Sequence, residues 1–175
     1  MHAADTPLVV AELPTASGCV LGTLTLNVES SLNSLTLEMI RAMTAALGAW
    51  RSRDDVAAIV LTGRGSKAFC AGGDIQALYR SCVANQQAGS EVDDYARCFF
   101  TEEYQLNLLM HEYPKPITTL GHGVVMGGGF GLLSASAFRV LTERSRLAFP
   151  EITIGLFPDA GGSWVLRQLP LAVAA

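Results

Sequence analysis

The stretch GHGVVMGGGFG, residues 121–131, runs from apolar residues into three consecutive glycines. The apolar part predicts a buried strand, and the residues after the glycines predict a buried helix. Because glycine has no side chain, a ligand can approach the backbone N–H groups of Gly127, Gly128 and Gly129 closely. At a helix N-terminus these N–H groups lack partners and the helix dipole favours negative charge. We therefore expect this turn to bind a negatively charged or strongly polarised group.

A second glycine-rich loop, SKAFCAGGDI at residues 66–75, directly follows the apolar run 56–63. Neither loop matches the GxxxxGK[ST] phosphate loop, and no GxGxxG with a suitably placed acid is present. Two backbone-donor loops favour a different chemistry, in which two N–H groups converge on one developing oxyanion. The alternative is that the glycines only allow close packing of helices on strands.

The remaining pattern alternates strands and helices, which is typical of an α/β fold with a largely buried sheet. Strands are expected over 7–27 (as a hairpin), 56–63, 117–126 and 138–142. Helices are expected over 35–50, from Asp74 as a short helix, over 92–112, and over 127–137.

Composition indicates one globular domain over residues 1–175, since half of the residues are hydrophobic and 16% are charged. The net charge is −4 and the basic residues are scattered, which argues against nucleic-acid binding. No apolar stretch is long enough to predict a membrane span. The sequence shows neither a secretory signal nor an arginine-rich transit peptide, so a cytoplasmic location is expected.

The four cysteines, Cys19, Cys70, Cys82 and Cys98, form no CxxC pair and have no histidine cluster nearby. We therefore expect no metal site and interpret them as reduced thiols in the core. The C-terminal stretch WVLRQLPLAVAA, residues 164–175, is apolar to its end. It predicts a buried terminal segment, a homo-oligomer, or a partner that covers this apolar end.

Three motifs together carry a family resemblance: KAFCAGGDI at 67–75, GHGVVMGGGFGL at 121–132 and AFPEITIGLFPDAGGS at 148–163. In this order and spacing they resemble the crotonase (enoyl-CoA hydratase/isomerase) superfamily, and most of all its hydrolases. The resemblance implies a β-spiral with flanking helices that binds an acyl-CoA thioester. The family's C-terminal helical part is absent, so residues 1–175 correspond to an N-terminal portion of a longer architecture.

The resemblance also implies the reacting groups. The backbone N–H groups of Gly73 and Gly128 would form an oxyanion hole for the thioester carbonyl. Glu151 would be the catalytic carboxylate, either as a nucleophile or as a general base on water. Asp159 would be its partner, contacting the distal hydroxyl of the substrate or assisting proton transfer. A shared apolar pocket would separate the pKa values of two such carboxyls.

Further positions are implied to touch the substrate. Glu103 matches a position on the central helix that contacts the acyl group. Phe69, Ala71 and Ile75 would line the acyl or pantetheine path, and Leu32 would lie near the adenine. Coenzyme A is then part of the substrate, and no separate cofactor is expected.

One departure from the family distinguishes the possible reactions. Hydratases carry a second glutamate two positions after the glycine triplet, and this chain has Gly131 there. We therefore expect hydrolysis of a short 3-hydroxyacyl-CoA, such as 3-hydroxyisobutyryl-CoA in valine breakdown, rather than hydration. Enoyl-CoA hydration or isomerisation and a non-catalytic acyl-CoA-binding or assembly module are the alternatives.

Three residues near the loops are expected to be structural. His122 is interpreted as a packed residue and Cys70 as a core thiol rather than a nucleophile. Asp74 is predicted to cap the helix that follows it.

Overall fold

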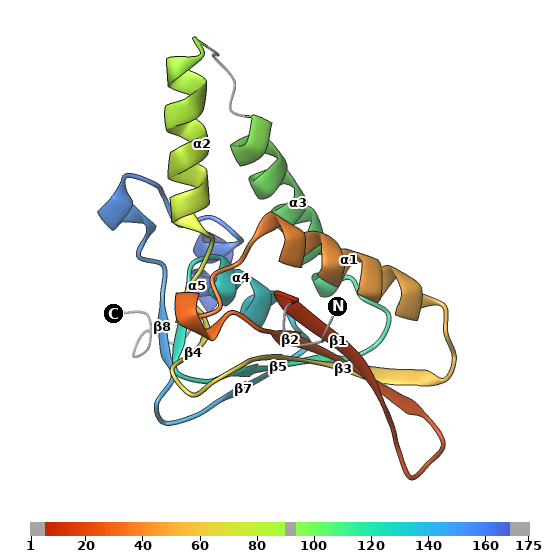
Figure 1. Cartoon of the computed structure of the whole chain (residues 1–175). Helices are drawn as coiled ribbons and strands as arrows, with labels where there is room; N and C mark the ends of the chain where they lie inside the picture. Colours follow the sequence, from red (N-terminus) through yellow and green to blue (C-terminus); the bar gives the residue numbers. More distant parts are fainter. Residues whose placement is uncertain (1–5, 90–93, 169–175) are drawn as a thin grey trace.

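The computed structural model describes residues 6–89 and 94–168, and in this part the strands form two sheets flanked by helices (Figure 1). The five-stranded sheet has the order β1-β2-β3-β5-β7 and the three-stranded sheet the order β4-β6-β8. All neighbouring strands are parallel except β1 and β2, which form the predicted hairpin. The strands are β1 Leu8–Pro14, β2 Val20–Leu26, β3 Val56–Gly63, β4 Ala68–Cys70, β5 Ile117–Gly121, β6 Val124–Met126, β7 Phe138–Leu141 and β8 Arg146–Ala148.

The helices are α1 Leu37–Arg51, α2 Ile75–Gln87, α3 Asp94–His111, α4 Gly128–Ala135 and α5 Gly162–Gln168, with 3₁₀ turns η1 Glu29–Ser31 and η2 Glu151–Ile154. From β3 onward the chain places successive strands alternately in the two sheets, and it returns through α2 and α3 or through α4. Each circuit therefore adds one strand to each sheet. This is the predicted β-spiral.

The stretch 117–126, predicted as one strand, is divided between the two sheets as β5 and β6. The chain turns at Gly123, whose φ of +58° lies in the left-handed region. A side chain at Gly123 would overlap the carbonyl oxygen of Lys67, which accepts a hydrogen bond from the Val124 N–H at 3.0 Å. Glycine at this corner thus lets β6 pair with β4, and periodicity alone does not reveal the break.

The predicted helix at 35–50 is α1, and its start is set by a side-chain cap at Thr36. The Thr36 hydroxyl accepts a hydrogen bond from the Met39 N–H at 3.2 Å. Its apolar side chains recur at helical spacing and are buried, and they are Met39, Ile40, Met43, Leu47 and Trp50. Burial of this face attaches α1 to the sheet and to α3.

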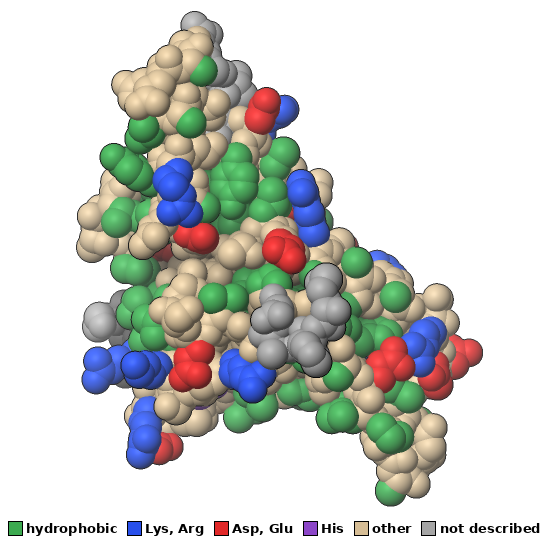
Figure 2. All heavy atoms as spheres, viewed as in Figure 1, with side chains coloured by type: hydrophobic (Ala, Val, Ile, Leu, Met, Phe, Trp, Pro, Cys, Tyr) green, Lys and Arg blue, Asp and Glu red, His purple; other side chains and the backbone are tan. Residues whose placement is uncertain are grey.

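The helix predicted as short after Asp74 is longer than expected, at 13 residues. It extends away from the sheets beside α3 (Figure 1) and buries only Leu78. Hydrophobic side chains are visible around these two helices on the face shown in Figure 2, and Tyr79 is 69% exposed. On the same face, basic and acidic side chains intermingle.

The helix α4 is buried on nearly all sides, as its uniformly apolar sequence predicts.

The prediction that all four cysteines lie in the core was wrong, because only Cys70 is buried. Cys82 is exposed on α2. Within those residues, no helix has the length and hydropathy needed to cross a bilayer.

Candidate active site

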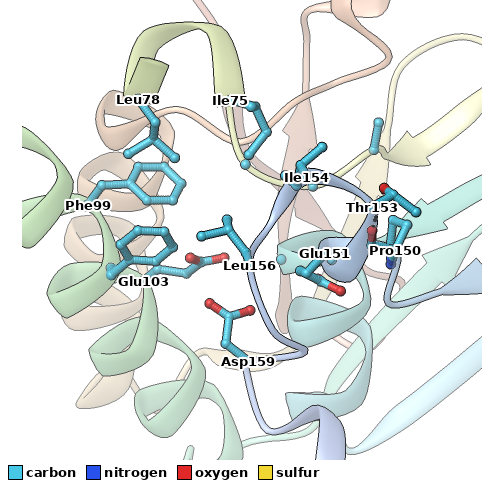
Figure 3. Close-up of a pocket in the computed structure, with 16 residues that line it drawn as sticks. Ile75, Leu78, Phe99, Glu103, Pro150, Glu151, Thr153, Ile154, Leu156 and Asp159 are labelled. Carbon is cyan, nitrogen blue, oxygen red and sulfur yellow. Dashed lines mark hydrogen bonds between the residues drawn. The ribbon is translucent and has the colours of Figure 1, made fainter. Parts of the chain in front are cut away.

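A cavity of about 230 Å³ opens where both glycine-rich loops meet η2 and α3 (Figure 3). Gly73 lies at the end of one loop and Gly128 at the start of α4, and both line the cavity. Its walls are largely apolar and also include three carboxylic acids, Glu103, Glu151 and Asp159. The spiral therefore brings together the two predicted oxyanion glycines and the three predicted acids, which are up to 86 positions apart in the sequence, from Gly73 to Asp159.

The backbone around Gly73 leaves its N–H group available to the cavity. The Leu35 N–H donates to the Gly72 carbonyl at 2.7 Å, and the Leu35 carbonyl accepts from the Asp74 N–H at 2.9 Å. In this parallel bridge the residue between, Gly73, directs its own N–H to the opposite side. No acceptor for that N–H is found among residues 6–89 and 94–168. Asp74 then caps α2, as predicted, by accepting from the Ala77 N–H at 3.0 Å.

Gly128 is the first residue of α4, and a helix leaves its first N–H groups without intrahelical acceptors. The preceding residue, Gly127, has a φ of +51°, which a larger residue would adopt only with strain. The Gly127 N–H donates to the Ala148 carbonyl at 3.1 Å, and this bond ties the turn to β8. The Gly128 N–H is consequently held in a fixed position at the helix end.

Glu151 begins η2 and is only 9% exposed. Both of its carboxyl oxygens are buried and make no hydrogen bond to any described residue. A Cβ atom at Gly127 would lie 3.0 Å from Glu151 Oε1, so this carboxyl lies directly above the glycine turn. Burial, with a smaller contribution from Asp159, raises its pKa above the ordinary value. The group is unpaired, and both oxygens are available to a ligand.

Glu103 projects from α3 and is 3% exposed. Burial, followed by repulsion from Asp159 and Glu151, raises its pKa to about 8. At neutral pH the Glu103 carboxyl is therefore largely protonated and is able to donate a hydrogen bond.

Asp159 is half-buried, and its carboxyl points toward that of Glu103 across the cavity (Figure 3). The Tyr104 hydroxyl donates to Asp159 Oδ2 at 2.5 Å. Burial and this bond raise the pKa of the Tyr104 hydroxyl, so it stays protonated as a donor. Tyr104 thereby orients one carboxylate oxygen and leaves the other accessible. The sequence reasoning missed Tyr104, although it adjoins Glu103 on the same helix.

The smaller predicted contacts divide into two groups. Ala71 and Ile75 line the cavity. Phe69 does not, because all three residues of β4 are buried and its ring is enclosed in the hydrophobic core. Leu32 also lies away from the cavity wall, and its carbonyl accepts from the Ala71 N–H at 3.0 Å. The expected role of Phe69 is therefore not supported, and Leu32 contributes by supporting the loop.

The apolar wall of the cavity was not predicted. It comes from α2, α3 and η2, and the residues are Leu78, Phe99, Phe100, Ile154 and Leu156. Cys70 lies beneath the loop, where burial raises the pKa of its thiol to about 12 and makes it a poor nucleophile. His122 lies outside the cavity, as expected.

The raised pKa of Glu103 predicts a pH-dependent stability. The carboxyl titrates near its ordinary value of 4.5 when unfolded and near 8 when folded. Its contribution to the free energy of unfolding is fully present below pH 4.5. This contribution is lost as the pH rises through 8, by at most about 1.4 kcal/mol per pH unit. We expect Glu103→Gln to match the wild type near pH 5 and to exceed its free energy of unfolding at pH 8. Urea unfolding at both pH values measures this difference.

Glu102→Gln is the matched control for this measurement. Glu102 adjoins Glu103 but forms an ion pair with Arg41 at 2.6 Å, and hydrogen bonding to Arg41 lowers its pKa. Its contribution to stability is lost only as the pH falls below the ordinary value of 4.5 toward that lowered pKa, so its effect is expected to be nearly the same at pH 5 and 8. A Glu103→Gln difference that does not grow from pH 5 to 8 would contradict the assignment.

The sequence and the fold match a known family. Residues 21–175 match the family model for enoyl-CoA hydratase/isomerase. The chain therefore belongs to the enoyl-CoA hydratase/isomerase family, as the three motifs predicted.

Among the curated relatives, the mitochondrial 3-hydroxyisobutyryl-CoA hydrolase of Xenopus tropicalis is 44% identical over 158 residues, which cover 90% of this chain and 39% of the relative. The human protein of the same name is 44% identical over 152 residues, covering 87% of this chain and 37% of the relative. This chain thus spans about two fifths of the length of these relatives.

Solved structures agree on the fold. A carnitinyl-CoA dehydratase from Mycobacterium thermoresistibile superposes with a TM-score of 0.83 at 38% identity, over 95% of this chain and 45% of that one. An enoyl-CoA hydratase from Rhodobacter sphaeroides gives a TM-score of 0.84 at 34% identity, over 97% and 47% of the two chains. The crotonase-like α/β fold is thereby confirmed.

The expected cytoplasmic location was wrong. The Xenopus tropicalis, human and Danio rerio relatives are all named as mitochondrial proteins, which points to mitochondria. The expectation rested on the first residues of the sequence, which are not a sound basis in a chain that spans only part of its relatives.

Proposed function

We propose that this chain carries the catalytic core of an acyl-CoA thioester hydrolase that acts on 3-hydroxyisobutyryl-CoA. The observation that carries the proposal is the unpaired, buried carboxyl of Glu151 above the glycine turn, beside two free backbone N–H groups. The names of relatives at 44% identity supply the substrate. Coenzyme A enters as part of that substrate, and the reaction needs no separate cofactor.

In the proposed reaction the thioester carbonyl oxygen accepts hydrogen bonds from the N–H groups of Gly73 and Gly128. These donors stabilise the negative charge that develops when the carbonyl carbon is attacked. Glu151 acts by one of two routes. As a general base it takes a proton from water, whose oxygen bonds to the carbonyl carbon; as a nucleophile it bonds to that carbon itself. In both routes the carbon–sulfur bond breaks, and the coenzyme A sulfur leaves and is protonated. In the nucleophilic route the acyl group is then held on Glu151 as an anhydride, which water hydrolyses to release the 3-hydroxy acid and restore the Glu151 carboxylate.

The other two acids assist in different ways. Glu103, protonated near neutral pH, donates a hydrogen bond toward the acyl group. Asp159, held by Tyr104 on one oxygen, has its second oxygen free for the substrate hydroxyl or for proton transfer. The two roles of Asp159 were both foreseen from the sequence and remain alternatives.

Hydration of a double bond is less compatible with the site. The position of the second hydratase glutamate is a glycine in this chain, and a larger side chain there would be crowded. A Cβ atom at Gly131 would lie only 2.7 Å from the Cβ of Ala160. A glutamate there would require the 159–161 segment to move.

The proposal also includes assembly with a second copy or a partner chain. The apolar run that suggested this assembly, 164–175, lies mostly beyond residue 168, outside the described residues.

The test is free-thiol release from 3-hydroxyisobutyryl-CoA, with hydration of crotonyl-CoA followed in parallel on the same preparation. Thiol release without hydration is the expected result. Hydration without thiol release would replace the proposal with the hydratase alternative. A folded chain that binds the thioester and performs neither reaction would instead indicate a binding module.

A further inference from the structure

A second cavity, of about 570 Å³, lies between α3, α4 and the segment 157–165. Asp159 belongs to the walls of both cavities, and so the second cavity adjoins the proposed reaction site. Most of its lining is apolar, and the polar side chains in it are Tyr104, Asn107, His111, Ser134, Asp159 and Ser163. A mainly apolar cavity with a few placed polar groups is typical of a small-ligand site.

Asn107 is distinctive among these polar groups. It lies one helical turn after Glu103 on α3, on the same face of the helix. Both its Oδ1 and its Nδ2 atoms are buried and have no hydrogen-bond partner in the described part of the chain. Burying an amide without partners is unfavourable, and such groups in folded proteins are normally satisfied by protein, water or ligand.

Three of the neighbouring side chains already contact other groups. Ser134 donates its hydroxyl hydrogen to the Gly131 carbonyl at 2.9 Å. Tyr104 donates to Asp159. His111 packs edge-on against Trp164, with ring centroids 5.9 Å apart. Asn107 therefore offers a free donor and a free acceptor side by side.

Gly131 packs closely against this amide. A Cβ atom at Gly131 would lie 3.1 Å from Asn107 Nδ2 and 2.7 Å from the Cβ of Ala160. The missing side chain that distinguishes this chain from hydratases thus lets α4, Asn107 and Ala160 meet at the wall of the second cavity. The same glycine has no positive φ, so its small size matters here for this close approach and not for its backbone conformation.

We infer that Asn107 recognises the hydroxyl group of the acyl chain and so selects hydroxyacyl thioesters over their unsubstituted analogues. A hydroxyl accepts one hydrogen bond and donates another, which matches the Nδ2 and Oδ1 groups of one amide. The inference rests on the proposed function, because it places the acyl group of that substrate beside Asp159. In this arrangement Asn107 binds the hydroxyl, and Asp159 is free to assist proton transfer.

The test measures binding, which does not require turnover. In the Glu151→Gln background, titration calorimetry gives the Kd of 3-hydroxyisobutyryl-CoA and of isobutyryl-CoA, which lacks only the hydroxyl. We expect the hydroxylated ligand to bind about 10- to 100-fold more tightly, because the analogue leaves the amide unpaired. Asn107→Leu is expected to reduce this preference to within about threefold, chiefly by weakening the hydroxylated ligand.

Two further variants keep the test decisive. Asn107→Ala serves if leucine does not fit the site, and it is expected to abolish the same preference. Gln105→Leu is the matched control, since it exchanges an exposed amide for leucine on the same helix outside both cavities. This control is expected to retain the full preference.

The outcomes separate this inference from the proposed hydrolysis. A preference that survives both Asn107 variants overturns the inference, and so does a parent protein that binds the two ligands equally. Equal weakening of both ligands shows that Asn107 only holds a buried water or supports the fold, which also overturns it. If the preference depends on Asn107 but no thiol is released from the wild type, the inference stands and the hydrolysis proposal fails.

Discussion

Replacing Glu151 with glutamine is expected to lower kcat for thioester hydrolysis by about 10²–10⁴-fold. The amide keeps the size of the side chain but can neither take a proton from water nor attack the carbonyl carbon. Because both carboxyl oxygens lack protein partners, the substitution breaks no described hydrogen bond. We therefore expect the fold and the Kd for the thioester to change little. Steady-state thiol release and a thermal unfolding midpoint measure the two quantities.

The pH profile provides a second readout for the same residue. Either route needs the ionised carboxylate, and the pKa of Glu151 is raised above 4.5. The wild-type rate is therefore expected to increase with pH through a pKa above 4.5, and this acidic limb should be absent from the residual rate of the variant. Glu143→Gln, which changes a side chain that is 85% exposed, is the control. A Glu151→Gln rate within threefold of the wild type would remove Glu151 from the mechanism.

The sequence was most informative where the signal is local. Helix boundaries depend on hydrogen bonds between residues that are close in the sequence. The cap at Thr36, the spacing of the α1 apolar residues and the prolines after α3 are signals of this local kind. The glycine triplet and the acids after it also lie on short segments of fixed spacing. Their roles were predicted through the family resemblance, which these short segments carry.

Features that depend on distant segments were not predictable in the same way. Nothing near Gly123 in the sequence shows that its φ is positive or that Lys67, just before β4, lies against it. Phe69 lies in the core and not on the cavity wall, and a three-residue strand buried on both faces has no alternation that would show this. The second cavity arises from the packing of α3 against the 157–165 segment. Its one available signal was the i, i+4 spacing of Glu103 and Asn107.

Gly128→Ala is expected to reduce kcat by about 10²–10³-fold, the usual effect of losing one oxyanion donor. The backbone of Gly128 is helical, so alanine is conformationally acceptable there. The added methyl group would, however, overlap Glu103 Oε1. Either the Glu103 carboxyl or the start of α4 has to move, and the second movement displaces the N–H group from the carbonyl. Thiol release and the unfolding midpoint distinguish the catalytic loss from loss of the fold.

Gly48→Ala is the matched control for the exchange itself, because Gly48 lies within α1 and no atom would approach its Cβ within 4 Å. Alanine there is expected to leave kcat unchanged and to increase the free energy of unfolding by up to about 1 kcal/mol. A Gly128→Ala protein that keeps wild-type kcat would contradict the assignment of this N–H to the oxyanion hole.

The Glu103→Ala background identifies how the loss arises. Glu103→Ala removes the carboxyl that the new methyl group meets, so α4 can accept alanine at position 128 without moving. If displacement of the N–H group causes the loss, Gly128→Ala should cost several-fold less in this background than in the wild type, a coupling that a double-mutant cycle measures. If the cost is equal in both, the methyl group blocks the substrate directly. The Gly128 N–H then keeps its position but the substrate carbonyl cannot reach it. In that case the loss of kcat comes from blocked access to the oxyanion hole and not from a change in its geometry.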